Sequence, residues 1–181
     1  MMNRRDLLKA AALGAAASWL PAWRREEKIR LGVASYSLRK FKRAQAIEMT
    51  KACETPYINV KSFHLPYTLK GDELVAARKE FDDAGLKVVG SGNNSLKNEK
   101  EIADAGARVL DFHIKDLKDL MNKNSQCPVG EGKMPIAEIF KQLIKQKFEG
   151  YVNLEYEIEE NDPLPGMKKS FAHMRKVAAE L

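Results

Sequence analysis

The sequence predicts an α/β protein built around a parallel sheet. Segments rich in strand-forming residues alternate along the chain with segments whose apolar residues recur at helical spacing. Two short, mostly apolar stretches near the C-terminus, 109–116 and 150–157, are typical of buried parallel strands and carry ionisable residues at their carboxyl ends. The alternation predicts right-handed crossovers, and the carboxyl ends of the strands are where such folds keep their chemistry.

The predicted elements follow one another in a regular order. Five strands are expected, at Ile29–Ser35, Tyr57–Phe63, Lys87–Ser91, Val109–Asp116 and Gly150–Glu157. Helices are expected at Arg43–Cys53, from a cap at Asp72 to Gly85, over a short stretch from Asn98 to Gly106, from Pro135 to Gly150, and through Phe171 to Leu181.

Residues 1–22 have the composition of a bacterial export signal. Arg4 and Arg5 form a twin-arginine pair, an Ala-rich run follows from Ala10 to Leu20, and small residues come next. The arginine pair indicates the Tat route, so we expect a mature domain of residues 23–181 in the periplasm or outside the cell. A retained anchor near the lipid and an ordinary N-terminal helix are the alternatives, and no stable membrane insertion is expected once the signal is removed.

Composition excludes some partners. The net charge of +6 is spread over lysines interspersed with Asp and Glu, so nucleic-acid binding is not indicated. Cys53 and Cys127 lie far apart in no metal-like spacing, and we interpret both as incidental. About 155 residues after the signal suffice for one domain with its own core.

Ionisable side chains at two strand ends are candidates for a site. An imidazole, His113, and a carboxylate, Glu155, are suitable ligands for a divalent metal. The alternative is a polar rim in which the histidine is simply hydrogen-bonded.

Several separate blocks resemble the sugar phosphate isomerase/epimerase family, whose members are TIM barrels similar to xylose isomerase. The blocks are the export signal, the segments Leu31–Ser37 and Tyr57–Pro66, the His-x-Lys-Asp pattern of His113, Lys115 and Asp116, the loop Gly130-Glu131-Gly132, the strand ending in Glu155, and Asp162–Gly166. The resemblance covers nearly all of the mature chain.

This resemblance implies an incomplete, truncated TIM-type barrel with about five parallel strands and outer helices. A full barrel has eight strands and about 250 residues, whereas the family's middle strands have no counterpart here. The gap lies near 98–106, and the strand before it is expected to lie beside the His113 strand. An open, doubly wound sheet is the alternative, and two open sheet edges would be available for self-association.

The resemblance also implies a function, a sugar or sugar-phosphate isomerase or epimerase that transfers a proton next to a carbonyl with the help of a metal. Glu155 is expected to be catalytic and, with His113, to bind a divalent ion (Mn, Mg, Co or Zn), weakly because other family ligands are missing. His64, Lys115 and Asp116 are the expected substrate-binding residues. For His64 the alternative is a plain loop histidine, and for Lys115 and Asp116 it is a mutual ion pair.

Two other functions are considered. A shortened, catalytically silent relative would at most bind sugar. A DNA-repair endonuclease of the same barrel type ranks last, because it needs many His and acidic ligands and a cytoplasmic location, whereas the chain has three histidines.

Overall fold

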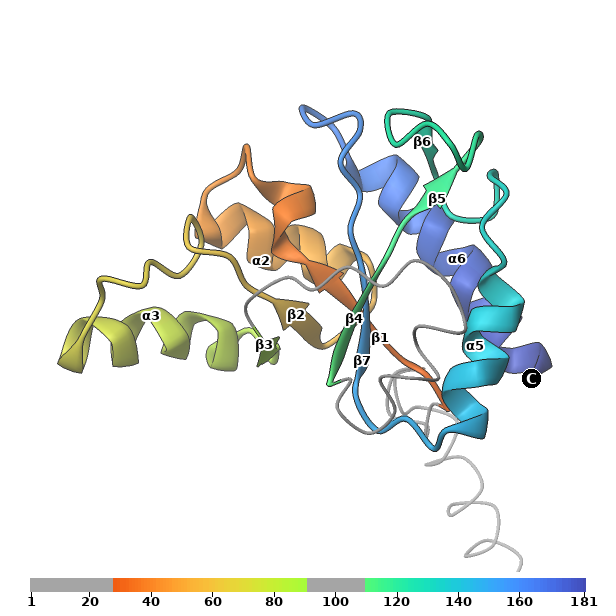
Figure 1. Cartoon of the computed structure of the whole chain (residues 1–181). Helices are drawn as coiled ribbons and strands as arrows, with labels where there is room; N and C mark the ends of the chain where they lie inside the picture. Colours follow the sequence, from red (N-terminus) through yellow and green to blue (C-terminus); the bar gives the residue numbers. More distant parts are fainter. Residues whose placement is uncertain (1–27, 91–109) are drawn as a thin grey trace, which may run out of the picture.

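The computed structural model of the chain describes residues 28–90 and 110–181 (Figure 1). Its centre is a curled sheet, a half-barrel of five parallel strands in the order β3-β2-β1-β7-β4. The strands are β1 Arg30–Ala34, β2 Tyr57–Asn59, β3 Lys87–Gly90, β4 Asp111–Ile114 and β7 Tyr151–Leu154. The predicted incomplete TIM-type barrel is therefore confirmed.

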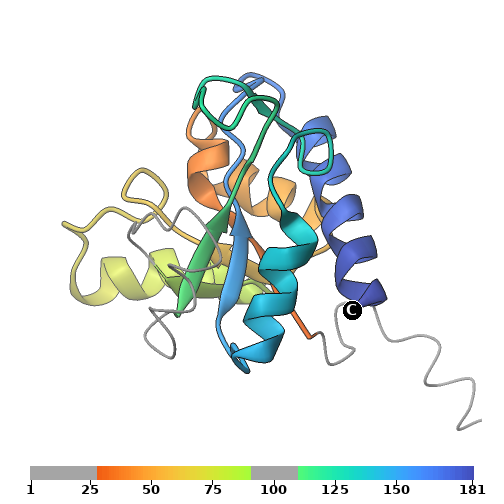
Figure 2. The same cartoon turned by 45° about the vertical axis from the view of Figure 1, so that its right-hand side comes forward.

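Four α-helices and one 3-10 turn accompany the sheet in the described part of the chain (Figure 2). They are η2 Ser35–Leu38, α2 Arg43–Ala52, α3 Gly71–Asp83, α5 Ile136–Lys145 and α6 Leu164–Glu180. Gly85 follows α3 with φ of +75°, as its predicted role at the helix end requires, because this left-handed conformation suits glycine.

Strand alternation divides the sheet into an apolar outer face and a polar inner face. The larger core cluster joins outward side chains of β1, β4 and β7, such as Val33, Phe112 and Leu154, to the apolar faces of α2, α5 and α6. A smaller cluster packs Ile58 of β2 against Phe81 of α3. The strand residues that alternate with these outward-facing ones face the concave side of the sheet. The concave side is therefore lined mainly by polar side chains.

The predicted position of the third strand is wrong. We expected β3 beside the His113 strand, β4, but the two lie at opposite edges of the sheet. The reason is that β7 pairs with β1 on one side and with β4 on the other, so β4 joins the sheet through the last strand. The predicted export signal, residues 1–22, and the short helix and gap near 98–106 lie outside the described residues.

A small antiparallel hairpin, β5 Asp116–Leu117 with β6 Gln126–Cys127, follows β4 and was not predicted. Its Gln126 binds the backbone after β7, donating to the carbonyl of Glu155 at 2.7 Å and accepting from the N–H of Glu157 at 2.9 Å. The hairpin therefore fixes the chain at the carboxyl edge of the sheet, next to the candidate site.

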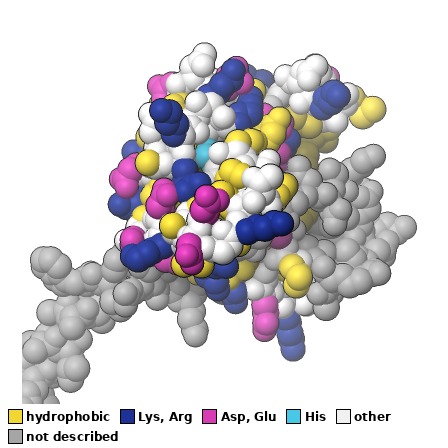
Figure 3. Space-filling model, turned by 90° about the vertical axis from the view of Figure 1, so that its left-hand side faces the viewer, with side chains coloured by type: hydrophobic (Ala, Val, Ile, Leu, Met, Phe, Trp, Pro, Cys, Tyr) yellow, Lys and Arg dark blue, Asp and Glu magenta, His cyan; other side chains and the backbone are white. Residues whose placement is uncertain are grey.

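The surface agrees with the charge pattern of the sequence. On the face in Figure 3, Lys and Arg side chains are interspersed with Asp and Glu. In residues 28–90 and 110–181, none of the helices has both the length and the apolar character that a membrane span needs.

Candidate functional site

Parallel pairing of β4 with β7 brings His113 and Glu155 together. His113 lies opposite Asn153 in the register, and Glu155 comes directly after β7 on the same face of the sheet. Nδ1 of His113 donates a hydrogen bond to Oε2 of Glu155, and Glu155 is only 6% exposed. The two residues that the sequence placed at neighbouring strand ends therefore form a buried pair.

Asp111 lies on the other side of the imidazole. Its Oδ2 is 3.5 Å from Nε2 of His113, and its carboxylate accepts hydrogen bonds from the side-chain amides of Asn59 and Asn153. Both asparagines are fully buried on the concave face. Gly32 of β1 leaves the space for this layer, because a Cβ at that position would collide with Oδ1 of Asn153.

The electrostatics of the pair favour its charged form. Burial lowers the pKa of His113, but hydrogen bonds to Asp111 and Glu155 and their negative charge outweigh it, so the pKa lies above the ordinary value. Burial raises the pKa of Glu155, while the bond from His113 and the charge of Lys115 lower it further than burial raises it. An imidazolium facing a carboxylate is the arrangement that both shifts favour.

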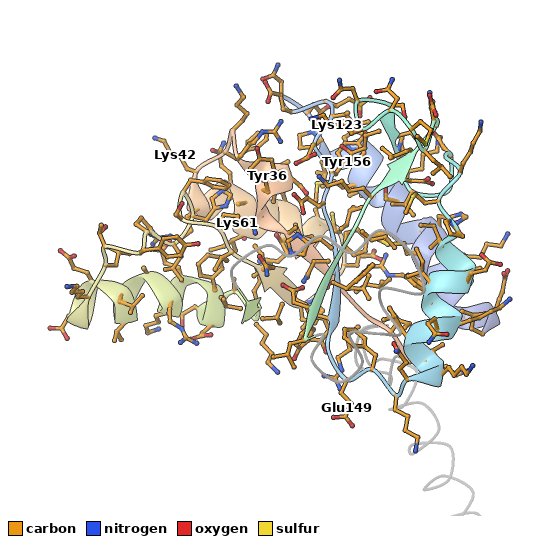
Figure 4. All side chains as sticks on the ribbon, viewed as in Figure 1. Tyr36, Lys42, Lys61, Lys123, Glu149 and Tyr156 are labelled. Atoms are coloured by element: carbon orange, nitrogen blue, oxygen red, sulfur yellow. The ribbon has the colours of Figure 1, made fainter. Side chains whose placement is uncertain are left out.

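Two lysines border Glu155. Nζ of Lys115 lies 3.5 Å from Oε1 of Glu155 and 2.6 Å from Oε2 of Glu157. Lys61, which follows β2 and is labelled in Figure 4, is 9% exposed, and its charge also lowers the pKa of Glu155. The sequence analysis identified Lys115 but missed Lys61, although Lys61 follows Tyr57 and Asn59 at the two-residue spacing of side chains on one face of a strand.

Asp116 is not brought to the His113 pair. It is 1% exposed and accepts hydrogen bonds from the backbone N–H groups of Gly130, Gly132 and Met134 at 2.8, 3.0 and 3.0 Å. Neighbouring strand residues point to opposite faces, so Lys115 turns to the glutamates and Asp116 to this loop. The contacts give Asp116 a structural role, where a substrate contact was expected.

His64 is fully buried beside the loop after β2. Its Nε2 lies 3.1 Å from the carbonyl oxygen of Phe41, and Arg43 donates to the carbonyl oxygen of His64 at 2.7 Å. Burial lowers the pKa of His64. Among the described contacts none joins His64 to His113 or Glu155, so the alternative of a structural loop histidine describes this environment better than a substrate ligand.

Three polar residues of the concave face were missed in the sequence. Asn59 and Asn153 each lie between two buried apolar residues, and Asp111 precedes the buried Phe112, which is the pattern of polar side chains inside a barrel. The signal was therefore present, but an isolated asparagine in a strand does not indicate which residue it will contact across the sheet.

The described residues do not supply the metal site that the family resemblance implies. Within 28–90 and 110–181, no group of three or more His, Cys, Asp or Glu side chains is arranged to hold a metal ion. The two expected ligands, His113 and Glu155, bind each other. Nε2 of His113 faces Oδ2 of Asp111 at 3.5 Å, and these two atoms fall short of the three or more protein ligands that catalytic metal sites generally use.

We predict weak metal binding by the full chain. Calorimetric titration with Mn²⁺, Mg²⁺, Co²⁺ and Zn²⁺ should give dissociation constants on the order of 1 mM or weaker, since two ligands leave most of the shell to water. His113→Gln should weaken this binding further, and His173→Gln, on α6, is the matched control. Tight binding that survives His113→Gln would contradict the prediction and place the metal elsewhere.

Comparisons with known proteins support the fold alone. No family model matches the chain, and no curated protein matches it. A crystal structure of an uncharacterized protein from Parabacteroides distasonis is similar, with a TM-score of 0.54, 15% identity, and coverage of 82% of this chain and 99% of that one. Because nearly all of that shorter chain is covered, a solved protein adopts a similar arrangement at this reduced size.

Proposed function

We propose that this protein is an isomerase or epimerase of sugars or sugar phosphates, acting at the carboxyl edge of β4 and β7. The buried His113–Glu155 pair is the observation that supports the proposal. The family resemblance in the blocks around these two residues is what suggests the substrate class.

The chemistry follows from the charges of the pair. Because its pKa is lowered, Glu155 stays ionised and can accept a proton from a substrate carbon next to a carbonyl. Oε1 is the oxygen available for this proton, because Oε2 accepts the hydrogen bond from His113. Because its pKa is raised, His113 stays protonated and can donate a proton to the developing enolate oxygen of the substrate. Lys115, 36% exposed at its side chain, attracts anionic substrate oxygens.

Deuterium exchange tests this function. In D₂O, the carbon-bound proton next to the carbonyl of a ketose or ketose phosphate should exchange in the presence of the full chain. Glu155→Gln should reduce the exchange rate by roughly 10²–10⁴-fold, the usual contribution of a general base. Glu157→Gln is the matched control, since it removes the same charge two residues away and should change the rate only a few-fold.

The same experiment decides between enzyme and silent relative. Sugar binding without any exchange, by the wild-type chain, would favour the shortened relative that only binds. Exchange that persists in Glu155→Gln would show that another residue is the base.

We further propose that the protein is exported by the Tat route. Expression in a bacterial host should give a processed chain that begins near Trp23, because the basic pair and the Ala-rich run end there. Mass spectrometry of the periplasmic and secreted fractions measures this terminus. An intact Met1 terminus on protein confined to the cytoplasm would contradict the proposal.

A further inference from the structure

The first residues of the strands form a second polar cluster, at the amino end of the sheet. Arg30, Tyr57, Lys87 and Tyr151 begin β1, β2, β3 and β7, and their side chains meet around the Tyr151 ring. The rings of Tyr57 and Tyr151 lie 4.9 Å apart, Arg30 Cζ is 5.5 Å from the Tyr151 centroid, and Lys87 donates to the Tyr151 hydroxyl oxygen at 2.8 Å. We call these four residues the amino-end cluster.

The cluster holds two cations that no described carboxylate neutralises. Within residues 28–90 and 110–181, neither Arg30 nor Lys87 belongs to an ion pair, whereas Arg39, Arg43 and Lys115 each do. Asp111 begins β4 opposite Tyr151. Its carboxylate accepts hydrogen bonds from the neutral amides of Asn59 and Asn153, and in the described part of the chain it forms no ion pair with Arg30 or Lys87. Two cations against one carboxylate leave positive charge in excess at this end of the concave face.

Hydrogen-bond donors also predominate. The ammonium of Lys87 and the guanidinium of Arg30 have only donors to offer, and the Tyr151 hydroxyl proton has no described acceptor. Burial raises the pKa of Tyr151, but hydrogen bonds from Lys87 and Arg30 lower it below the ordinary value, which is the response of a phenol surrounded by positive charge. The four side chains of the amino-end cluster therefore include no negatively charged hydrogen-bond acceptor.

We propose that the amino-end cluster binds the phosphate group of a small phosphorylated molecule. Two cations match the charge of a phosphate dianion, the hydroxyl of Tyr151 adds a neutral donor, and the guanidinium of Arg30 suits paired phosphate oxygens. Lys87 is exposed, so a ligand reaches the cluster from solvent. The site is separate from the His113–Glu155 pair, because Glu155 comes four positions after Tyr151 along the chain, roughly 13 Å at the rise of a strand.

Calorimetric titration of the full chain with inorganic phosphate, at ionic strength held constant with NaCl, tests the site. We expect Lys87→Gln and Arg30→Gln each to weaken phosphate binding about tenfold or more. Tyr151→Phe keeps the ring and should weaken it about threefold. Lys79→Gln removes the same charge from an exposed Lys–Asp pair on α3 and should leave the affinity unchanged.

Three further titrations show what the cluster recognises and whether the site is independent of Glu155. Glycerol phosphate should bind as phosphate does, whereas acetate, with one charge, should bind at least tenfold more weakly. Glu155→Gln should leave phosphate binding unchanged, so loss of the proposed isomerase function is distinguishable from loss of this site. Affinity that is equal in wild type and Lys87→Gln, or no binding up to about 20 mM phosphate, would overturn the proposal. Lys87 is exposed, so its variant gives this answer even if Arg30→Gln fails to fold.

Discussion

Replacing Asp116 by Asn is expected to lower the free energy of unfolding by about 3 kcal/mol. The carboxylate is 1% exposed and accepts four backbone N–H groups, those of Leu117, Gly130, Gly132 and Met134. An asparagine at this position offers one oxygen, and its amide hydrogens face donors, so buried N–H groups lose their partners. Denaturant unfolding measures the change.

Asp119→Asn is the matched control for this prediction. Asp119 is exposed and its carboxylate accepts a single N–H, from Met121 at 3.0 Å, so its replacement should cost less than about 0.5 kcal/mol. Equal costs for the two variants would show that the Asp116 contacts add nothing to the stability of the folded chain.

Replacing His113 by Gln is expected to destabilise the fold strongly at about pH 5–6 and less at higher pH. The variant leaves Asp111 and Glu155 close together without the imidazolium between them, and breaking such a buried pair costs about 3 kcal/mol. The size of the loss should depend on pH, because the wild-type contribution itself titrates.

The direction of this dependence follows from the two pKa shifts. The folded pKa of His113 lies above its ordinary 6.5, so its stabilisation is complete below that pH and is lost as pH rises through the folded pKa. The folded pKa of Glu155 lies below its ordinary 4.5, so its stabilisation is present above that pH and is lost as pH falls through the folded pKa. The pair therefore contributes most between about pH 4.5 and 6.5.

Denaturant unfolding of wild type and His113→Gln at a series of pH values measures the difference. His173→Gln, at a half-buried position on α6, controls for the loss of a histidine elsewhere. A difference that stays constant from pH 5 to pH 9 would contradict a raised pKa for His113.

Periodicity and composition were sufficient to predict the sheet. The apolar residues of β1, β4 and β7 alternate or run together as buried strands do, and Gly85 marked the end of α3. Neighbouring strand ends were enough to predict that His113 and Glu155 meet, because parallel strands present their carboxyl ends at one edge.

Strand order could not be predicted in the same way. The short segment between β3 and β4 in the sequence suggested that they are neighbours in the sheet. Sheet order depends on which strand edges pair, however, and β7 lies between β1 and β4 and pairs with both. The role of Asp116 was also beyond the sequence, since its partners are backbone groups of a loop that starts 14 residues later. The structure explains the second glycine of the Gly-x-Gly pattern in that loop, because a Cβ at Gly132 would collide with the Asp116 carboxylate.

The pairing of β1 with β7 has a consequence for the order of folding during synthesis. Arg30 pairs with Tyr151 and Val33 with Leu154, so the central strand completes its hydrogen bonds only when a segment more than a hundred residues later has left the ribosome. Contacts of such long sequence separation make folding slow and its completion late. A nascent or truncated chain that ends before β7 would expose one edge of β1, and unpaired strand edges recruit other chains into aggregates.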